Sequence, residues 1–333
     1  MFLDAGLTAS SLREVAGHAA AAEALGFDAV WSSETQHDPF LPLALVAEHT
    51  RSLRFGTAVA ISFARSPTVL AHTAWDLAAA SGGRFILGLG TQVRAHIERR
   101  FGMPWPASPV GQLREYLAAL RSIWSAWQTG EKLNVRGEYY SLTLMTPFFS
   151  PEAMEHPTIP VYIAGVNRSL CRLAGEAADG LHVHPYHSVR YLRDVVRPAV
   201  EEGQKRAGRE AGAVAYSVSV FVVTDEAEAA FARSQIAFYA STPSYRVVME
   251  THGWEGTADQ LGALARRGAW AEMGGCITDE MLQAFAVVAP AEALAEALHE
   301  RYQGLADRLT LYLPFRPGER DGFWSRLIED LQA

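Results

Sequence analysis

The sequence predicts an α/β protein built as a single (β/α)8 TIM barrel, and three observations support that fold class. Eight short apolar, β-rich segments are spaced along the 333 residues, and each pair is separated by helical sequence. Residues 54–94 show the repeating unit most clearly, with an apolar run, a helix closed by Ser-Gly-Gly-Arg at 81–84, and a second apolar run. Strand, helix and strand in that order place both strands parallel in one sheet. Eight such units favour a closed barrel over an open sheet, in which about six strands are more usual.

Each element follows from its local pattern. The strands are expected near residues 2–7, 28–33, 54–62, 85–89, 161–164, 180–184, 214–223 and 309–313. Among the helices, 113–127 carries leucine and tryptophan along one stripe, and 226–240 and 260–267 flank a Pro/Gly-rich segment at 241–258. Two gaps are long, residues 95–160 after the fourth strand and 224–308 after the seventh. The composition does not change there, so we expect one domain over 1–333 with insertions on barrel loops.

Composition narrows the class of protein. Hydrophobic residues make up 49% of the chain and charged residues 20%, which allows a large core. The net charge of −8 is spread along the chain and only two lysines occur, so we expect no nucleic-acid partner. No apolar stretch approaches the roughly 20 residues that cross a bilayer, no secretory signal is apparent, and two cysteines are too few for a disulfide framework. We therefore expect an acidic protein of the cytoplasm that does not bind membranes.

In barrels of this type the chemistry lies at the carboxyl ends of the strands, and the turn after the fifth strand is the most informative. Gly165, Val166, Asn167, Arg168 and Ser169 place a glycine and several donors at the start of a helix. Free backbone amides and the helix dipole would form a phosphate cradle there, and Arg168 could add a charge-assisted hydrogen bond. The alternative is an ordinary strand-to-helix turn capped by Asn167, since many barrels have such turns.

Other strand ends offer ionisable side chains. Glu34 and His37 follow the second strand and could do acid–base work; the alternative is a polar loop in which Asp38 caps the next helix. His182 and His184 lie on one face of a strand, a spacing compatible with a metal ion. No third ligand converges on them, so we expect hydrogen-bonded histidines and no metal.

Two more positions stay open between alternatives. Asp4 is a candidate at the end of the first strand. Arg94, after the fourth strand, could hold an anionic group or form a salt bridge with Glu98 on a helix.

Eight stretches occur in a specific order along the chain. They are AEALGFDAVWSSE at 22–34, RFGTAV with RSP at 54–67, SGGRFILGLG at 81–90, RRFG at 99–102, LREYLAALRSIW at 113–124, RGEYYSL at 136–142, IPVYIAG at 159–165 and AGEAADGL at 174–181. Together they resemble the bacterial-luciferase-like superfamily of flavin- and deazaflavin-dependent oxidoreductases. The resemblance covers residues 1–225 well and the remainder only as barrel closure.

The resemblance implies a bulge at the end of the third strand, where a cis peptide that precedes no proline supports an isoalloxazine ring. In this sequence that peptide falls at Ala58–Val59. The ring would lie between this bulge, Gly90, Thr91 and Gln92, and the second-strand loop. The phosphate cradle of the family would fall on Gly165 to Ser169. Relatives are commonly homodimers, and the tryptophan-rich residues 105–127 could form an apolar interface or pack on the barrel.

The acid–base residues of the relatives do not carry over. Deazaflavin-dependent alcohol and sugar-phosphate dehydrogenases have a histidine after strand two, a tryptophan four residues on and a glutamate after strand four. The matching positions here hold Glu34, Asp38 and Val93. Luciferases have a histidine directly after the glutamate that matches Glu34, and this chain has Thr35. The expected chemistry therefore follows from the cofactor more than from catalytic residues, with His37 as a spatial candidate.

The stretch GTQVRAHIERRFGMPW at 90–105 is most similar to members assigned to coenzyme F420, an 8-hydroxy-5-deazaflavin that moves hydride at C5 and does not activate oxygen readily. We expect an oxidoreductase that transfers hydride between F420 and a small organic substrate. One alternative is an FMN-dependent monooxygenase supplied with reduced flavin by a partner reductase, and another is a non-catalytic flavin-binding protein. A Schiff-base aldolase is disfavoured because neither lysine lies at a strand end. Residues 224–308 are expected to cover the pocket mouth and set substrate specificity, but their sequence does not indicate which ligand binds.

Overall fold

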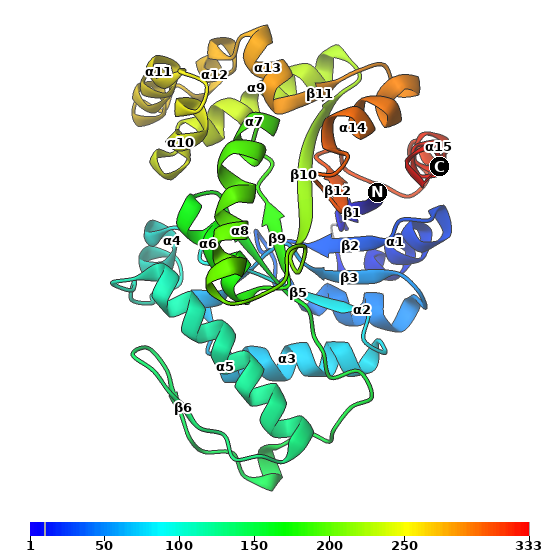
Figure 1. Ribbon diagram of the computed structural model, residues 1–333. Helices are drawn as coiled ribbons and strands as arrows, with labels where there is room; N and C mark the ends of the chain where they lie inside the picture. Colours follow the sequence, from blue (N-terminus) through cyan, green and yellow to red (C-terminus); the bar gives the residue numbers. More distant parts are fainter. Residues whose placement is uncertain (10, 333) are drawn as a thin grey trace.

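The computed structural model describes residues 1–9 and 11–332, and its centre is a closed barrel of eight parallel strands (Figure 1). The strands follow one another around the barrel in chain order: β1 (Phe2–Gly6), β2 (Ala29–Ser32), β3 (Arg54–Thr57), β5 (Phe85–Gly90), β8 (Val161–Gly165), β9 (Gly180–Val183), β10 (Ala215–Val223) and β12 (Arg308–Leu311). The last strand pairs with the first, with Arg308 opposite Phe2, and this pairing closes the barrel. The predicted (β/α)8 fold is confirmed.

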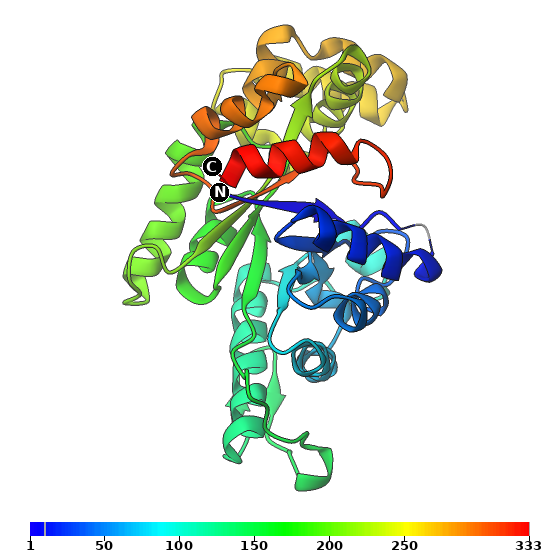
Figure 2. The same ribbon diagram turned by 90° about the vertical axis from the view of Figure 1, so that its right-hand side faces the viewer.

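Helices between the strands cover the outside of the barrel. They are α1 (Leu12–Leu25), α2 (Leu41–His49), α3 (Pro67–Ala80), α6 (Arg168–Ala177), α7 (Val189–Tyr191) continuing through a π-helical turn into α8 (Arg197–Arg206), α14 (Leu294–Tyr302) and α15 (Asp321–Gln332). Figure 2 shows α15 lying across the start of the chain, where it packs on β1 and α1. No helix in the part of the chain that the structure describes has the length and apolar character needed to cross a membrane.

The insertion after β5 forms an arm that extends away from the barrel (Figure 1). It contains α4 (Arg94–Arg99), the long helix α5 (Pro109–Thr129), and a hairpin of β6 (Val135–Arg136) and β7 (Ser141–Leu142). The indole of Trp124 donates a hydrogen bond to the Ala71 carbonyl at 3.2 Å, and Trp127 packs against Trp75 with ring centroids 5.5 Å apart. These tryptophans therefore pack on α3, one of the two roles expected for them, and the homodimer stays a prediction.

The insertion after β10 is more helical than its sequence suggests. It holds α9 (Glu226–Ala240), α10 (Arg246–Glu250), α11 (Glu255–Arg266), α12 (Trp270–Met273), α13 (Asp279–Phe285) and the short strand β11 (Ala286–Val288), which pairs with β10. The segment 241–258, expected to be irregular, contains α10 and the start of α11. Short helices of this kind depend on tertiary packing, because the small number of hydrogen bonds within them does not offset the cost of helix nucleation.

The barrel interior is filled by rings at mid-height and by small residues toward the carboxyl ends. His182 lies 4.9 Å from the Trp31 ring and 5.2 Å from the Tyr162 ring, centroid to centroid. Gly90 on β5 and Ala164 on β8 also face inward, nearer the carboxyl ends of their strands. Side chains on a strand alternate in direction, and these residues follow Gly88 and Tyr162 by two positions. The inward face therefore carries small residues at the end of the barrel where sites of this fold are built.

Candidate active site

The third barrel strand is interrupted where it reaches this end. β3 stops at Thr57, and the chain resumes as β4 (Ala60–Ile61), which pairs with the last part of β5. Between them the Ala58–Val59 peptide is cis, as expected. Gly90 lies against this bulge, since a Cβ added there would come within 2.7 Å of Val59 Cγ2. Any larger residue at position 90 would push the bulge outward, so the glycine sets how closely β5 approaches it.

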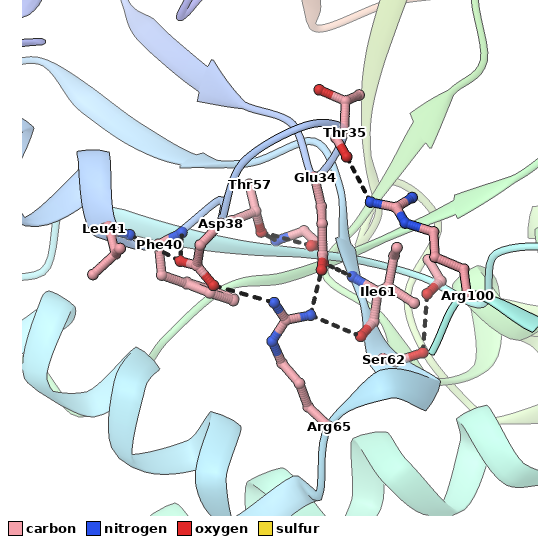
Figure 3. A network of polar contacts seen from close by, with 12 residues as sticks. Glu34, Thr35, Asp38, Phe40, Leu41, Thr57, Ile61, Ser62, Arg65 and Arg100 are labelled. Atoms are coloured by element: carbon pink, nitrogen blue, oxygen red, sulfur yellow. Dashed lines mark hydrogen bonds and ion pairs between the residues drawn. The ribbon is translucent and has the colours of Figure 1, made fainter. Parts of the chain in front are cut away.

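The Glu34 carboxylate holds the far side of the bulge (Figure 3). One of its oxygens accepts hydrogen bonds from the Ile61 amide and from Arg65 Nη1, each at 2.7 Å. The side chain is only 6% exposed. Arg65 Nη1 also donates to the Ile61 carbonyl at 3.2 Å. The Glu34–Arg65 ion pair therefore contacts both the amide and the carbonyl of Ile61 at the end of β4. This geometry makes Glu34 an anchor of the bulge.

The rest of the β2–α2 loop is fixed by the same network (Figure 3). Asp38 accepts from Arg65 Nη2 at 3.3 Å and from the amides of Phe40 and Leu41, so it caps α2. The Thr35 carbonyl accepts from Arg100 at 2.6 Å, which ties this loop to the segment after β5. His37 lies exposed on the loop. The alternative interpretation of this stretch, a polar loop with Asp38 as cap, therefore matches the structure, and acid–base roles for Glu34 and His37 stay predictions.

The loop after β5 forms the next part of the rim. Thr91 and Gln92 are partly exposed, and Gln92 has a φ of 59°, which is uncommon for a residue other than glycine. Its side-chain oxygen accepts from the Val93 amide at 3.0 Å, which supports that backbone turn. Arg94 is 70% exposed and pairs with Glu98 at 2.9 Å, the salt bridge that was one of its two expected roles.

The turn from β8 into α6 is capped by Asn167, as in the alternative interpretation, and the phosphate cradle stays a prediction. The Asn167 side chain accepts from the Leu170 amide at 3.0 Å and caps the helix. The amides of Arg168 and Ser169 lie in the first turn, where a helix offers no internal acceptor, so they are suited to an anion. Gly165 is needed for the close turn, because a Cβ there would lie 3.0 Å from Leu170 Cβ. Val166 follows it, and its carbonyl accepts from the Tyr191 hydroxyl at 2.7 Å.

The charge expected from Arg168 is used elsewhere. Its guanidinium is exposed and pairs with Glu202 on α8 at 3.2 Å. A phosphate cradle at this turn would therefore consist of backbone amides and the helix dipole. β5 pairs with β4 on one side and β8 on the other, so the bulge, Gly90 and this turn lie at neighbouring strand ends.

His182 lies on β9 and His184 directly follows the strand, and the two imidazoles lie in different surroundings. Burial, helped by the charge of Arg308, lowers the pKa of His182 to about 3, and its Nε2 has no hydrogen-bond partner within residues 1–9 and 11–332. His184 Nδ1 accepts from the Tyr186 amide at 3.1 Å, and burial lowers its pKa to about 3 as well. No group of three or more metal-ligating side chains occurs among the described residues. His184 is therefore hydrogen-bonded as expected, and a backbone hydrogen bond with Thr57 partly opposes the effect of burial on the pKa of His182.

Sequence reasoning missed the partners that lie far apart in the chain. Arg65 belongs to the RSP stretch at 65–67, but the sequence does not show that it contacts Glu34. Ser62 lies in the bulge region at the end of the third strand, but the sequence does not show that its hydroxyl donates to the Gly90 carbonyl at 3.0 Å. Both follow the predicted bulge within a few residues, and that position was the available signal.

Several known proteins are similar to this chain in sequence or in fold. The family described as luciferase-like monooxygenase matches residues 2–308. The chain is 49% identical to an uncharacterised protein of Mycobacterium tuberculosis (strain ATCC 25618 / H37Rv), with 90% of each chain covered. It is 30% identical to 5,10-methylenetetrahydromethanopterin reductase of Methanolobus tindarius, with 82% of each covered. Its fold is similar to coenzyme F420 dependent tetrahydromethanopterin reductase from Methanopyrus kandleri, at a TM-score of 0.79 and 19% identity over 99% of this chain and 98% of the other.

Proposed function

The chain belongs to the luciferase-like monooxygenase family, and from that premise we propose that it transfers hydride between coenzyme F420 and a small organic substrate. One observation carries the proposal: the cis Ala58–Val59 bulge and the glycine turn into α6 share one rim of the barrel. The reductase of Methanolobus tindarius supports a reductive reaction, and the F420-dependent enzyme of Methanopyrus kandleri supports the choice of cofactor.

The residues present fit such a cofactor. The turn at Gly165 and the amides of Arg168 and Ser169 would hold its phosphate, and the bulge with Gly90 would form a wall beside its ring. When bound, the deazaflavin would supply hydride chemistry at C5. The chain would orient the cofactor and the substrate. Glu34, already bonded to Ile61 and Arg65, would keep the bulge in place.

Titration of the purified protein with oxidised F420 and with FMN tests the proposal. We expect F420 to bind and FMN to bind at least tenfold more weakly. Ser169→Asp adds a carboxylate to the first turn of α6, a position where acidic residues favour the helix but would repel a phosphate. We expect this variant to keep its melting temperature and to weaken F420 binding by roughly 10- to 100-fold, the loss of one or two charge-assisted contacts.

Ser169→Asn, similar in size but uncharged, is the matched control and should bind F420 within threefold of the parent. Equal affinity in Ser169→Asp and Ser169→Asn would refute the phosphate site. Tight FMN binding with oxygen consumption when reduced flavin is supplied would replace the proposed activity by the monooxygenase alternative, with a reductase as partner.

A further inference from the structure

Four rings from three segments gather beyond the carboxyl end of β9. His184 and Tyr186 follow β9, Tyr239 comes from α9, and Tyr245 ends the 3-10 turn Pro243–Tyr245. We call these four residues the tyrosine cluster. The imidazole centroid lies 4.6 Å from the Tyr239 ring and 4.8 Å from the Tyr245 ring. The insertion after β10 therefore supplies two of the four rings (Figure 1 shows α9 and α10 on the side toward which β9 points).

The tyrosine cluster lies next to the proposed cofactor turn. Gly165 on β8 pairs in register with Val183 on β9, so Val166 and His184 are the next residues of neighbouring strands. His184, Tyr239 and Tyr245 are each partly exposed. A molecule beside the cofactor can therefore reach their rings.

One polar group of the cluster is available to a ligand. Because His184 Nδ1 accepts from the Tyr186 amide, the proton of the neutral imidazole lies on Nε2. Nε2 has no acceptor among the described residues, so it is a free donor. The Tyr186 hydroxyl also lacks a hydrogen-bond partner among the described residues, but Tyr186 is fully buried, so this hydroxyl does not face a ligand.

Uncharged aromatic side chains contact the cluster. Tyr186 stacks on Phe285, and the Tyr239 hydroxyl lies 3.0 Å from that of Tyr312. Burial raises the pKa of Tyr186, Tyr239 and Tyr245. Within residues 1–9 and 11–332, no hydrogen bond, ion pair or cation–π contact joins a charged side chain to any of the four. A phosphate or carboxylate would lose its hydration here without gaining a counter-charge, whereas an uncharged planar molecule would gain ring contacts.

We propose that the tyrosine cluster recognises the substrate, and that this substrate is an uncharged, planar carbonyl compound. Its flat part would pack on Tyr239 and Tyr245, and its carbonyl oxygen would accept a hydrogen bond from His184 Nε2. Such a donor stabilises the negative charge that develops on a carbonyl oxygen during reduction. Hydride from the reduced cofactor would add to the carbonyl carbon, and the oxygen, which gains the electron pair of the broken C=O π bond, would take a proton from water. His184 therefore keeps its own proton and acts by orienting the carbonyl group. The inference rests on the proposed function and adds the substrate class to it.

Calorimetry with 2-naphthaldehyde as an uncharged planar probe, and glucose 6-phosphate as an anionic one, tests the cluster with and without F420. We expect the parent protein to bind the aldehyde and not the sugar phosphate. Tyr239→Leu and His184→Leu should weaken aldehyde binding at least tenfold. His184→Gln keeps an N–H donor and should stay within threefold of the parent. F420 affinity and melting temperature should change little in all of these variants.

Trp270→Leu is the control in the same insertion, because Trp270 on α12 is 54% exposed and packs on Phe238, outside the four rings of the cluster. It should bind the aldehyde like the parent. Three results would overturn the inference: sugar-phosphate binding in preference to the aldehyde, the same loss in Trp270→Leu as in Tyr239→Leu, or no aldehyde binding by a protein that binds F420. The last result would leave the proposed function standing. Aldehyde binding that depends on His184 and Tyr239, in a protein that does not bind F420, would support the cluster and refute the cofactor.

Discussion

At the scale of single residues, Glu34 shows what a sequence can and cannot reveal about a site. Its place after a predicted strand correctly locates it at the carboxyl end of the barrel strands. Its task depends on Arg65 and the Ile61 amide, which lie 31 and 27 residues further along the chain and approach only once the barrel has formed. The cis peptide at Ala58–Val59 was predictable because the family resemblance aligned it. The tyrosine cluster was not, because Tyr239 and Tyr245 meet His184 through an insertion that the resemblance does not cover.

Replacing Glu34 by glutamine separates anchoring from proton transfer. The amide keeps one acceptor oxygen but loses the charge, so we expect the free energy of unfolding to fall by about 1–3 kcal/mol. The dissociation constant of F420 should rise roughly tenfold, one power of ten being about 1.4 kcal/mol, while kcat changes less than KM. Glu98→Gln, which removes the exposed pair with Arg94, should cost less than about 1 kcal/mol and leave F420 binding unchanged. A large fall in kcat with unchanged KM and F420 affinity would instead show that Glu34 is an acid or base.

At the scale of elements, the barrel strands were predictable because each is a short apolar run bounded by turn residues, whereas the turns between elements depend on distant partners. Glu23 near the end of α1 is an example. One of its oxygens accepts from the amides of Arg51, Ser52 and Leu53, which form the turn before β3. Partial burial raises the pKa of Glu23, but these hydrogen bonds outweigh it and lower the pKa to about 2.

This shift predicts a pH-dependent contribution to stability. A depressed pKa in the folded state stabilises the protein above the unfolded value of 4.5, and the contribution is lost as the pH falls from there toward about 2. Glu23→Gln should therefore lower the free energy of unfolding by about 1–2 kcal/mol at neutral pH, with a difference that shrinks on acidification. Thermal unfolding of both proteins between pH 7 and the lowest pH that preserves a reversible transition measures this. A difference that does not change with pH would show that the carboxylate charge plays no part.

At the scale of the whole molecule, an ion pair inside the barrel joins its first and last strands. Asp4 on β1 is 1% exposed and accepts from Arg308 on β12 through both of its oxygens, at 2.6 and 2.8 Å. The Trp31 indole donates to the same carboxylate at 2.9 Å. The sequence placed Asp4 among the candidates for the site, because its partner lies 304 positions away. The structure instead places it where the barrel closes, below the rings of the interior.

Breaking this pair should destabilise the barrel strongly. Arg308→Met leaves the Asp4 carboxylate buried without its counter-charge, and we expect a loss of about 3–5 kcal/mol in denaturant unfolding. Adding Asp4→Asn removes the unpaired charge while keeping an acceptor for Trp31, so the double variant should be more stable than the Arg308→Met single variant. Recovery of soluble, folded protein only in the double variant would lead to the same conclusion. Additive losses from the two changes would contradict it, because they would show that the first and last strands are joined without any coupling between these side chains.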